Sequence, residues 1–557
     1  MSSFSISNAA PVAVATAALL AAAVAAPASA MGRGSTAPDT SHRQTAVGIE
    51  VLNADGAAPT VNLTQTRHDF RFGTALRSSD YLQNAALRQF TLDHFNSVTL
   101  VNGFHWQFTE TNENNIHSDF LEAAKQATAA GLDLRGHAVI WPQNRAWLNP
   151  TDILPGYTYL GSDNGLSNPD SRLTPELLRA RIDERIASLA GYDVGGDKGV
   201  YINEFDATNE TIYRNNFDGF NYMADTLIPA GTPGAEKEAL FVEIVAGWYK
   251  QMKAVRPDAR LVANEFNIAN AGSDYEARQH RDRIQAHLKA GAPIDAIGLQ
   301  LHMNRVNTYE ELMHRFDILA ETGLKIEITE FDNGFGNNDF EGGRPFTAAE
   351  EAANLDAALR AAWDHPAVTG FTMWGFDDAT HWRDNAPLLD GDLNIKSVEA
   401  APWFDLVEGQ WISSATGLVD GDTDTYTRGT YEVEIDGVTT TLEITTNNGR
   451  IIVDALANTA YLAGDFNGDG VLDANDTEAF VLALQSPGAY TQAYGLDPLA
   501  RADVNTDGVI NELDFSAFQD FFDAGTAPVL SVPIPEPASL ALVAVGATLL
   551  LRRSRAA

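Results

Sequence analysis

The chain has 557 residues and contains no cysteine. Disulfide bonds, thiolate-bound metals and cysteine nucleophiles are therefore excluded. Because many exported proteins also lack cysteine, its absence does not indicate where the protein works.

Positive charge is scarce as well, because 37 Lys and Arg residues stand against 75 Asp and Glu, a formal net charge of −38. Such a surface repels a polymer of phosphates, so a nucleic-acid partner is not expected. A neutral polysaccharide or calcium is compatible with this charge. The length exceeds one ordinary domain and fits a barrel of about 300 residues with smaller modules.

The two ends of the chain carry its longest apolar runs. Residues 11–26 are almost wholly Ala, Val and Leu, and a small-residue cleavage site follows at Pro27–Ala30. This pattern predicts a signal peptide over 1–30, with an Ala-rich leader as the alternative. Near the other end, Pro535-Glu536-Pro537 precedes a mostly apolar stretch of fourteen residues and then Arg552, Arg553 and Arg555. Fourteen residues are short for a membrane-spanning helix.

The C-terminal arrangement resembles the PEP-CTERM sorting signal of Gram-negative bacteria, with a simple tail anchor as the alternative. Both readings imply an exported protein, extracellular or associated with the cell surface, that meets the membrane only through this tail. Composition then divides the chain into a signal peptide (1–30), a linker (31–46), a catalytic domain (47–406), a β-rich segment (407–460), calcium-binding repeats (461–524), a second linker (525–534) and the sorting signal (535–557).

The catalytic region alternates short apolar runs with stretches of helical spacing, such as 175–190 and 350–363. This rhythm is typical of parallel βα units. Eight such units predict an α/β fold, a closed (β/α)8 TIM barrel. The expected strands are 70–76, 95–101, 133–141, 204–210, 259–267, 296–302, 325–332 and 368–376. Residues 407–460 instead alternate β-formers with polar residues, with turns at Asp436-Gly437 and Asn448-Gly449, and predict a small antiparallel element.

Active sites of such barrels lie at the carboxyl ends of the strands. Two carboxylates stand there, together with amide, imidazole and indole groups: Glu210, Glu330, His137, Trp141, Asn209, Gln300, His302, Trp374 and, in the following loop, Trp382. Glycoside hydrolysis needs a carboxylic acid that protonates the leaving oxygen and a second carboxylate across from it. We expect Glu210 to be the protonated acid/base, Glu330 the ionised nucleophile, and His302 a hydrogen-bond donor to Glu330.

Seven segments resemble glycoside hydrolase family 10, the retaining endo-β-1,4-xylanases, over roughly 47–406. They are FNSVT (95–99), GHAVIW (136–141), FDATNE (205–210), ANEFN (263–267), GLQLHM (298–303), ITEFD (328–332) and TMWGFDDATHW (372–382). The resemblance implies hydrolysis of xylan by double displacement without a cofactor. It makes Glu210 the acid/base, Glu330 the nucleophile and the remaining strand-end residues substrate ligands. It places Asp332 and Asp206 in supporting roles.

Some positions depart from the family pattern. After the second strand the family has Glu-Asn and a nearby Lys that hold a sugar, whereas this chain has Val101, Asn102 and His105. Asn102 and His105 are expected to bind substrate here. Pro142 and Thr211 also replace family residues. The changes leave open a decorated xylan or another plant or algal β-glycan. A non-catalytic surface protein that binds glycan and calcium is the third alternative.

Other residues of catalytic type are expected to be structural. Glu204, Glu265 and Glu327 lie within predicted strands, and Glu265 is expected to support the site by hydrogen bonding. Trp106, Trp147 and Trp363 are expected to pack or to line the cleft.

Two acidic loops, 38 residues apart, have the spacing of calcium ligands. Calcium requires six to eight oxygen ligands around a sharp turn. The expected ligands are Asp465, Asn467, Asp469, Val471 (through its carbonyl), Asp473 and Asp476 in the first loop, and Asp503, Asn505, Asp507, Val509, Asn511 and Asp514 in the second. With Asp at the twelfth position the loops resemble dockerin modules. This implies structural Ca²⁺ and a cohesin-type partner, with a calcium-stiffened spacer as the alternative.

Overall fold

The computed structural model describes residues 39–52, 59–111, 113–141, 174–211, 219–333, 345–383, 385–445, 450–454, 459–504, 509–511 and 513–514. The predicted signal peptide, the linker at 525–534 and the sorting signal at 535–557 lie outside the described residues, as do Pro142 and Trp147. The fold below belongs to the unit Thr40–Ala557.

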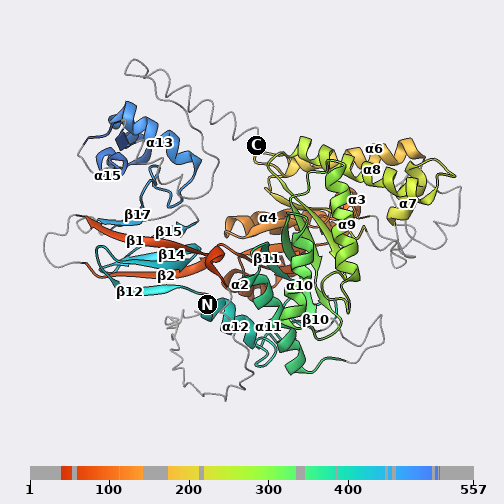
Figure 1. The fold of residues 1–557 in the computed structure, drawn as a ribbon. Coiled ribbons are helices and arrows are strands. Elements are labelled where there is room, and N and C mark those ends of the chain that lie inside the picture. The colour runs from red at the N-terminus through yellow and green to blue at the C-terminus, as the bar shows by residue number, and fades with distance from the viewer. Residues whose placement is uncertain are drawn as a thin grey trace, which may run out of the picture. The chain divides into compact units, whose positions relative to one another are not determined.

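The described part of the catalytic region contains eight parallel strands that close into a barrel, which confirms the predicted fold class. Each strand pairs with the next along the chain, and the last pairs with both the seventh and the first (Figure 1). The strands are β3 (Arg71–Arg77), β4 (Ser97–Val101), β5 (Asp133–Gly136), β6 (Glu204–Asn209), β7 (Arg260–Phe266), β8 (Ala296–Gln300), β10 (Lys325–Asn333) and β11 (Val368–Met373), and a short β9 (His302–Met303) pairs with the end of β10.

Helices follow the strands along the chain. They are α1 (Ser78–Gln83), α2 (Ala85–His94), α3 (Trp106–Thr111), α4 (Ile116–Ala129), α6 (Pro175–Ala187), α7 (Gly219–Leu227), α8 (Gly234–Val255), α9 (Tyr275–Lys289), α10 (Tyr309–Ala320), α11 (Ala348–Asp364) and α12 (Ala401–Asp405). Two begin with capping boxes, Thr308 with Glu311 and Thr347 with Glu350, which satisfy backbone N–H groups at the helix start. Among the described helices, none has the length and apolar composition needed to cross a membrane.

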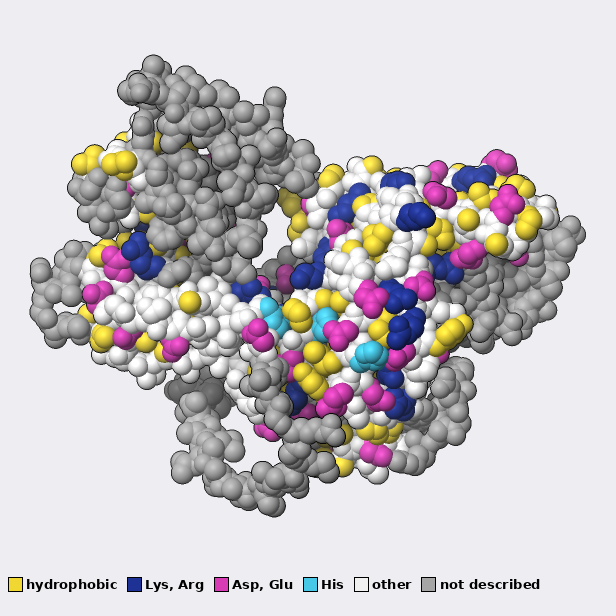
Figure 2. All heavy atoms as spheres, in the orientation of Figure 1, with side chains coloured by type: hydrophobic (Ala, Val, Ile, Leu, Met, Phe, Trp, Pro, Cys, Tyr) yellow, Lys and Arg dark blue, Asp and Glu magenta, His cyan; other side chains and the backbone are white. Residues whose placement is uncertain are grey.

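The helix surfaces that face the viewer in Figure 2 carry acidic and basic side chains in mixture. Ion pairs connect neighbouring helices there, for example Arg281 on α9 with Glu321, which directly follows α10. The apolar faces of the helices turn inward, and Trp363 on α11 is 3% exposed, which fits its expected packing role. The core of the barrel thus fixes the strands whose ends carry the polar site residues.

The remaining strands form two four-stranded sheets. The first has the order β13-β1-β16-β17 and the second β12-β2-β14-β15. Their bounds are β1 (Gln44–Leu52), β2 (Val61–His68), β12 (Ser414–Leu418), β13 (Thr423–Thr427), β14 (Gly429–Ile435), β15 (Val438–Ile444), β16 (Arg450–Asp454) and β17 (Thr459–Leu462). The expected turn at Asp436-Gly437 joins β14 to β15, with positive φ at both residues as a tight hairpin requires.

The predicted boundaries at the start of the catalytic region are wrong. Residues 44–46 belong to strand β1 and not to a linker, and the segment 47–68 supplies β1 and β2 to the two sheets instead of the barrel. β1 pairs in parallel with β16, so the segment at 407–460 is not purely antiparallel. Figure 1 shows these early strands, in red, beside late strands in cyan. The barrel chain is therefore inserted between β2 and β12.

Arg43 joins the start of this β region to the barrel. Its side chain is 6% exposed, and it donates hydrogen bonds to the backbone carbonyls of Trp363, Ala362, His365 and Val368. Four carbonyl acceptors satisfy the donors of a buried guanidinium, which would otherwise be costly.

The C-terminal helices of the described chain are α13 (Ala474–Gln485), α14 (Pro487–Tyr494) and α15 (Pro498–Ala502). The apolar run at 478–484, which follows the first acidic loop, lies within α13, and the corresponding run at 514–522 lies almost wholly outside the described residues. Phe466, Leu472 and Phe480 share one apolar cluster with the two sheets.

Candidate active site

The carboxyl ends of the barrel strands bring the predicted residues to one rim. Asn209 is the last residue of β6 and Glu210 follows it, Gln300 ends β8, and Glu330 lies in the second half of β10. Parallel strands in a closed barrel point their carboxyl ends to one side, which explains why residues over a hundred positions apart meet.

Glu210 leaves β6 with a positive φ of 62°. Its backbone N–H donates to the carbonyl of Asn264, and its Oε1 accepts from the side-chain amides of Asn209 and Gln300, both at 3.2 Å. Burial and then the negative charge of Glu330 raise the pKa of the Glu210 carboxyl. This carboxyl therefore retains its proton to higher pH than an ordinary glutamate.

Glu330 is 3% exposed and has a different set of partners. Its Oε1 accepts from Asn264 Nδ2 at 2.8 Å, and its Oε2 lies 3.3 Å from His302 Nε2. Burial alone would raise its pKa, but the hydrogen bond from His302 and nearby positive charges bring the pKa below the usual value. The two carboxyls are thus driven toward opposite protonation states.

Asn264 on β7 connects the two carboxyls, and the sequence analysis did not single it out. Its Nδ2 donates to Glu330 and, at 2.8 Å, to Asn209 Oδ1, while its Oδ1 accepts from Thr329 Oγ1 at 2.6 Å. Asn209 Oδ1 also accepts from Gln300 Nε2 at 3.0 Å. The next residue, Glu265, was expected to support the site, but its Oε1 accepts from the backbone N–H of Phe266.

Asp332 organises the other side of Glu330. It is fully buried, and its Oδ2 accepts from His302 Nδ1 at 2.9 Å and from Trp382 Nε1 at 2.8 Å. Burial alone would lower the pKa of His302, but Asp332 and Glu330 raise it to about 9. His302 is therefore a cation at neutral pH and donates to both carboxylates, as the sequence predicted for Glu330.

A second buried pair approaches Glu330 from β5 and β6. His137 Nδ1 lies 2.7 Å from Asp206 Oδ2 and 3.9 Å from Glu330 Oε1, and Arg135 donates to Asp206 Oδ1. Atoms of His137, Asp206 and Glu330 all lie within 4.8 Å of one another. Asp206 therefore orients His137.

Aromatic rings line the same rim. The rings of Trp141 and Trp374 lie 5.3 Å and 5.0 Å from that of His137, and His105 lies 5.1 Å from Trp141. Trp382 is 48% exposed, so one face of its indole is open to a ligand. Apolar ring faces suit the C–H surfaces of sugars.

Asn102 has a positive φ of 70° directly after β4, and its carbonyl accepts from the backbone N–H of His105. This turn brings His105 beside His137, with 5.4 Å between ring centroids. Asn102 thus positions His105 through the backbone.

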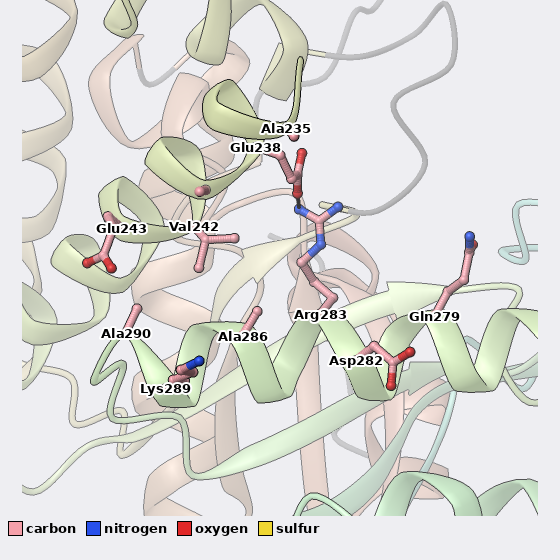
Figure 3. A pocket seen from close by; sticks show the side chains of 11 residues that line it. Ala235, Glu238, Val242, Glu243, Gln279, Asp282, Arg283, Ala286, Lys289 and Ala290 are labelled. Atoms are coloured by element: carbon pink, nitrogen blue, oxygen red, sulfur yellow. Dashed lines mark ion pairs between the residues drawn. The ribbon is translucent and has the colours of Figure 1, made fainter. Parts of the chain in front are cut away.

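A large groove lies elsewhere, between α8 and α9 on the outside of the barrel (Figure 3). It has a volume of about 650 Å³. Ala235, Val242 and Ala286 contribute apolar lining, and Glu238 forms an ion pair with Arg283 across it. Because it contains neither the paired carboxyls nor the indole rings, it is not the candidate active site.

The first acidic loop is folded in the described structure. Asp476 Oδ1 accepts from the backbone N–H groups of Phe466 and Asn467, and Asp465 accepts from those of Gly468 and Gly470. Burial raises the pKa of Asp476 to about 7. Of the second loop, Asn505 and Asp507 lie outside the described residues, while Asp503, Val509, Asn511 and Asp514 lie within them.

Residues 463–521 match the Dockerin type I domain. Over 377 residues the chain is 26% identical to the Anti-sigma-I factor RsgI6 of Acetivibrio thermocellus, covering 67% of this chain and 41% of that protein. The chain spans between 30% and 43% of the length of the first four curated relatives.

One relative is covered over almost its whole length. It is the Endo-1,4-beta-xylanase A of Caldicellulosiruptor saccharolyticus, 26% identical over 380 residues, with 63% of this chain and 95% of that protein covered. A solved structure, that of a GH10 protein from Paenibacillus barcinonensis, aligns with 22% identity and a TM-score of 0.47 over 60% of this chain and 94% of that one. The model of Glycosyl hydrolase family 10 matches residues 62–401, which is more than half of the sequence and includes every barrel strand. The chain belongs to glycosyl hydrolase family 10.

Proposed function

We propose that this protein is a retaining endo-β-1,4-xylanase that cleaves xylan by double displacement. The observation that carries the proposal is a pair of strand-end glutamates, Glu330 buried and Glu210 partly buried, whose pKa values shift in opposite directions, Glu210 upward and Glu330 downward. Glycoside hydrolysis needs one carboxylic acid and one carboxylate. Membership of glycosyl hydrolase family 10 and the curated xylanase relative support the same substrate class.

In the first step Glu330 attacks the anomeric carbon while Glu210 protonates the leaving glycosidic oxygen. A covalent glycosyl-enzyme forms and the aglycone leaves. In the second step Glu210, now a carboxylate, takes a proton from water, which attacks the anomeric carbon and releases Glu330. Two inversions retain the β configuration, and no metal or redox group takes part in either step.

The surrounding residues support this chemistry through their contacts. Asn264 and His302 each donate to one oxygen of Glu330 and hold the attacking carboxylate in place. Asn209 is fixed by Asn264 and can offer its amide to a sugar 2-hydroxyl, a contact that strengthens as the oxocarbenium ion develops. Trp374 and the open face of Trp382 bound the space for sugar rings.

Product stereochemistry tests the mechanism directly. Full-length protein is incubated with xylan oligosaccharides, and the anomeric proton of the first product is followed by NMR. We expect the β-anomer first, with slow mutarotation to the mixture. First appearance of the α-anomer would contradict double displacement.

A matched pair of variants tests the residues. Glu210→Gln should retain the glycosylation step on aryl xylobiosides with good leaving groups, because these need no acid, and should lose it on xylan. Glu265→Gln removes a buried carboxyl of the neighbouring strand β7 and should retain both activities. Equal losses in the two variants would remove the special role of Glu210.

A second substrate, a decorated xylan or another β-glycan, is favoured by one observation. Where the family pattern has a lysine, this chain places the ring of His105 against Trp141, with 5.1 Å between centroids. Comparing kcat/KM for plain xylan, arabinoxylan, glucuronoxylan and mixed-linkage β-glucan decides between the substrates. A preference of tenfold or more for a substrate other than plain xylan would replace the first proposal's substrate and keep its mechanism.

We also propose that the two acidic loops hold structural calcium. Carboxylates gather in the first loop, and buried Asp476 has no cation among its described hydrogen-bond partners. Asp465, Asn467, Asp469, Asp473 and Asp476 would supply side-chain oxygens, and Val471 its carbonyl. Titration of the metal-free protein by calorimetry should give two binding events. If calcium binding releases no heat and a chelator does not change unfolding, the proposal of bound calcium is contradicted.

The cellular location and the partners of the protein are proposed from its terminal segments and its dockerin-like module. Export through the signal peptide, retention through the C-terminal sorting signal and docking to a cohesin-type protein remain our proposals, supported by the sequence pattern and by the Dockerin type I match. Cell fractionation with and without residues 535–557 tests the sorting proposal, because deletion should release the enzyme from the cell surface.

A further inference from the structure

His381 is a fully buried histidine that the proposed mechanism does not use. It lies in the segment after β11, where its backbone N–H donates to the carbonyl of Asp377 at 3.0 Å. Gly375 adopts a positive φ of 107°, and a Cβ there would come within 2.8 Å of His381 Cδ2. A glycine at this position therefore makes room for the imidazole to enter the wall of the active site.

The hydrogen bond to one ring nitrogen fixes the tautomer. His381 Nδ1 accepts from the backbone N–H of Arg383 at 3.2 Å, and a neutral imidazole that accepts at Nδ1 carries its proton on Nε2. His381 Nε2 has no hydrogen-bond partner in the described structure, although its side chain is fully buried. A buried donor without a partner costs free energy unless a nearby acceptor compensates.

The nearest carboxylate to this donor is Asp332. His381 Nε2 lies 3.7 Å from Asp332 Oδ2, beyond hydrogen-bond distance but within strong electrostatic range. Asp332 Oδ2 is the atom that holds His302, and His302 in turn holds Glu330. The Nε2–H of His381 therefore faces Asp332, which is connected through His302 to the nucleophile Glu330.

We propose that His381 is a positioning residue of the nucleophile, which acts on Glu330 through Asp332 and His302. The inference rests on the proposed function of Glu330. The Nε2–H dipole turns its positive end toward the Asp332 carboxylate and adds a donor there without adding a charge. It makes the electrostatic potential at His302 and Glu330 more positive, which favours the ionised form of Glu330.

The balance of charge supports this role. The titratable and charged groups that act on His381 are Asp332 on β10, His302 on β9, and Arg383 and Asp378 on its own segment. Burial, which outweighs the raising effect of Asp332, lowers the pKa of His381 to about 4. The ring is neutral above that pH. When it protonates, the added positive charge acts on Glu330 in the same direction as the dipole.

The sign of the effect is therefore the same in both protonation states of His381. Removing the ring makes the potential at its neighbours more negative, so the pKa values of His302 and Glu330 should both rise. We expect shifts of about 0.3–0.5 pH unit, because a dipole at this distance is weaker than a full charge.

The experiment follows the titration of His302 in the full-length protein labelled with ¹³C at histidine Cε1, assigned by comparison with His302→Asn. In His381→Phe the His302 midpoint should rise by about 0.3–0.5 unit. The midpoint of the acid limb of kcat/KM, which reports the free enzyme, should move up in parallel. KM at the pH optimum should stay unchanged, because His381 does not touch substrate in this account.

His365→Phe is the matched control. His365 is 3% exposed, and its Nδ1 accepts from the backbone N–H of Ala367, two residues on, at 3.2 Å, as His381 does from Arg383. Its Nε2 faces Asp317, which is on α10 and not in the active site. The control should lose stability as His381→Phe does, and it should leave the His302 midpoint in place.

His381→Asn keeps the experiment decisive if the phenylalanine variant does not fold. Asparagine retains an acceptor for the Arg383 N–H and is too short to reach Asp332, so the same upward shift is expected. His381→Gln, which can place an amide N–H near Asp332, should return the midpoint toward the wild-type value. Unchanged His302 midpoints in His381→Phe and His381→Asn, or an equal shift in His365→Phe, would overturn the proposal.

The titration needs no turnover, which separates the two proposals. If the wild type hydrolyses no glycan, the proposed function fails, and the His302 midpoints still show whether His381 acts on Asp332 and His302.

Discussion

Buried glutamates lie at both ends of this barrel, and their partners differ. At the amino-terminal end Glu204 lies 2.5 Å from Arg71 and 3.2 Å from both Arg260 and Arg135. At the carboxyl-terminal rim Glu210 accepts from the amides of Asn209 and Gln300 and from the indole of Trp141, and Glu330 accepts from an amide and an imidazole.

The pKa of each glutamate depends on the charged and hydrogen-bonding groups around it. Burial alone would raise the pKa of Glu204, but the surrounding arginines hold it far below the usual value. Burial and the charge of Glu330 outweigh the neutral donors around Glu210, so the pKa of Glu210 rises. Arginines thus hold Glu204 as an anion at the amino-terminal end, whereas burial and the charge of Glu204 raise the pKa of its neighbour Glu327 to about 7 although it shares Arg71 and Arg260. At the carboxyl-terminal rim Glu210 can exchange a proton. Burial of an acid in a barrel strand does not by itself indicate catalysis.

The largest expected effect is the loss of activity in Glu330→Gln. The amide has nearly the same shape and cannot attack the anomeric carbon, so kcat on xylan should fall on the order of 10⁴-fold or more. The melting temperature should fall modestly, because the amide can still be held by Asn264 but no longer balances the His302 cation. Steady-state rates and melting curves measure both. Retention of a tenth of the wild-type kcat would contradict the nucleophile assignment.

The reverse pattern is expected at the other end of the barrel. Glu204→Gln removes the anion that Arg71, Arg135 and Arg260 share. Because Glu327 still pairs with Arg71 and Arg260, and Asp206 with Arg135, the loss of unfolding free energy should stay below the about 3–5 kcal/mol expected when a buried charge is left without a partner. The kcat of the folded fraction should stay within about threefold of wild type, since no atom of Glu204 is at the rim. Denaturant unfolding and active-site-normalised rates test this. Lost activity with intact stability would erase the contrast between the two ends.

The pH dependence of kcat/KM tests the difference in protonation state between Glu210 and Glu330. Activity requires Glu330 ionised and Glu210 protonated, so kcat/KM should fall at low pH as Glu330 gains a proton and at high pH as Glu210 loses one. In Glu330→Gln the charge that raises the pKa of Glu210 is gone. Titration of Glu210 in that variant, by NMR of labelled glutamate, should therefore show a lower midpoint than in wild type. An unchanged midpoint would mean that the two carboxyls do not interact.

Stability should depend on pH with opposite signs at the two carboxyls. Glu330 has a lowered folded pKa, so its contribution is present above the unfolded pKa and is lost as the pH falls through the folded pKa. Glu210 has a raised folded pKa, so its contribution is present at low pH and is lost as the pH rises through the folded pKa. Glu210→Gln should therefore be more stable than wild type above the raised pKa. Melting temperatures of both proteins across pH check the sign, and a lower melting temperature of the variant at high pH would contradict it.

The smallest effect is expected for Trp382→Phe. It removes the indole N–H that donates to Asp332 at 2.8 Å and retains an aromatic face for the sugar. One hydrogen bond to a charged group is worth about 1.5–3 kcal/mol, part of which His302 can compensate, so kcat/KM should fall roughly 5–30-fold. Trp411→Phe, a half-buried indole stacked on Trp363 away from the rim, is the control. Kinetics with xylohexaose would measure the difference, and equal behaviour of the two variants would contradict a role for the indole N–H.

The barrel and its catalytic pair could be predicted because strand ends are visible in the sequence. A run such as EITEFD places its carboxylates by the alternation of a strand, and the carboxyl ends of parallel strands meet on one side. Glu210, Glu330 and His302 were found in this way, and Asp332 through the resemblance to glycoside hydrolase family 10.

Other features depended on partners that are distant in sequence. Asn264 was overlooked in favour of Glu265, although adjacent strand residues face opposite sides and only Asn264 contacts Glu330. The segment ANEFN (263–267) could have identified Asn264, because this asparagine lies at the same rim as Asn209. β1 was assigned to a linker and to the barrel because its pairing with β16 spans some four hundred residues, which no local pattern records.

The most direct test of the central claim is a covalent trap. A 2-fluoro-xylobioside with a good leaving group forms the glycosyl-enzyme and slows its hydrolysis, because the fluorine destabilises the oxocarbenium-like transition state of the second step. Mass spectrometry of the digested full-length protein should show one added fluoro-xylobiosyl group on the peptide that contains Glu330. An adduct on a different residue, or inactivation without any adduct in a protein that hydrolyses xylan, would contradict the account.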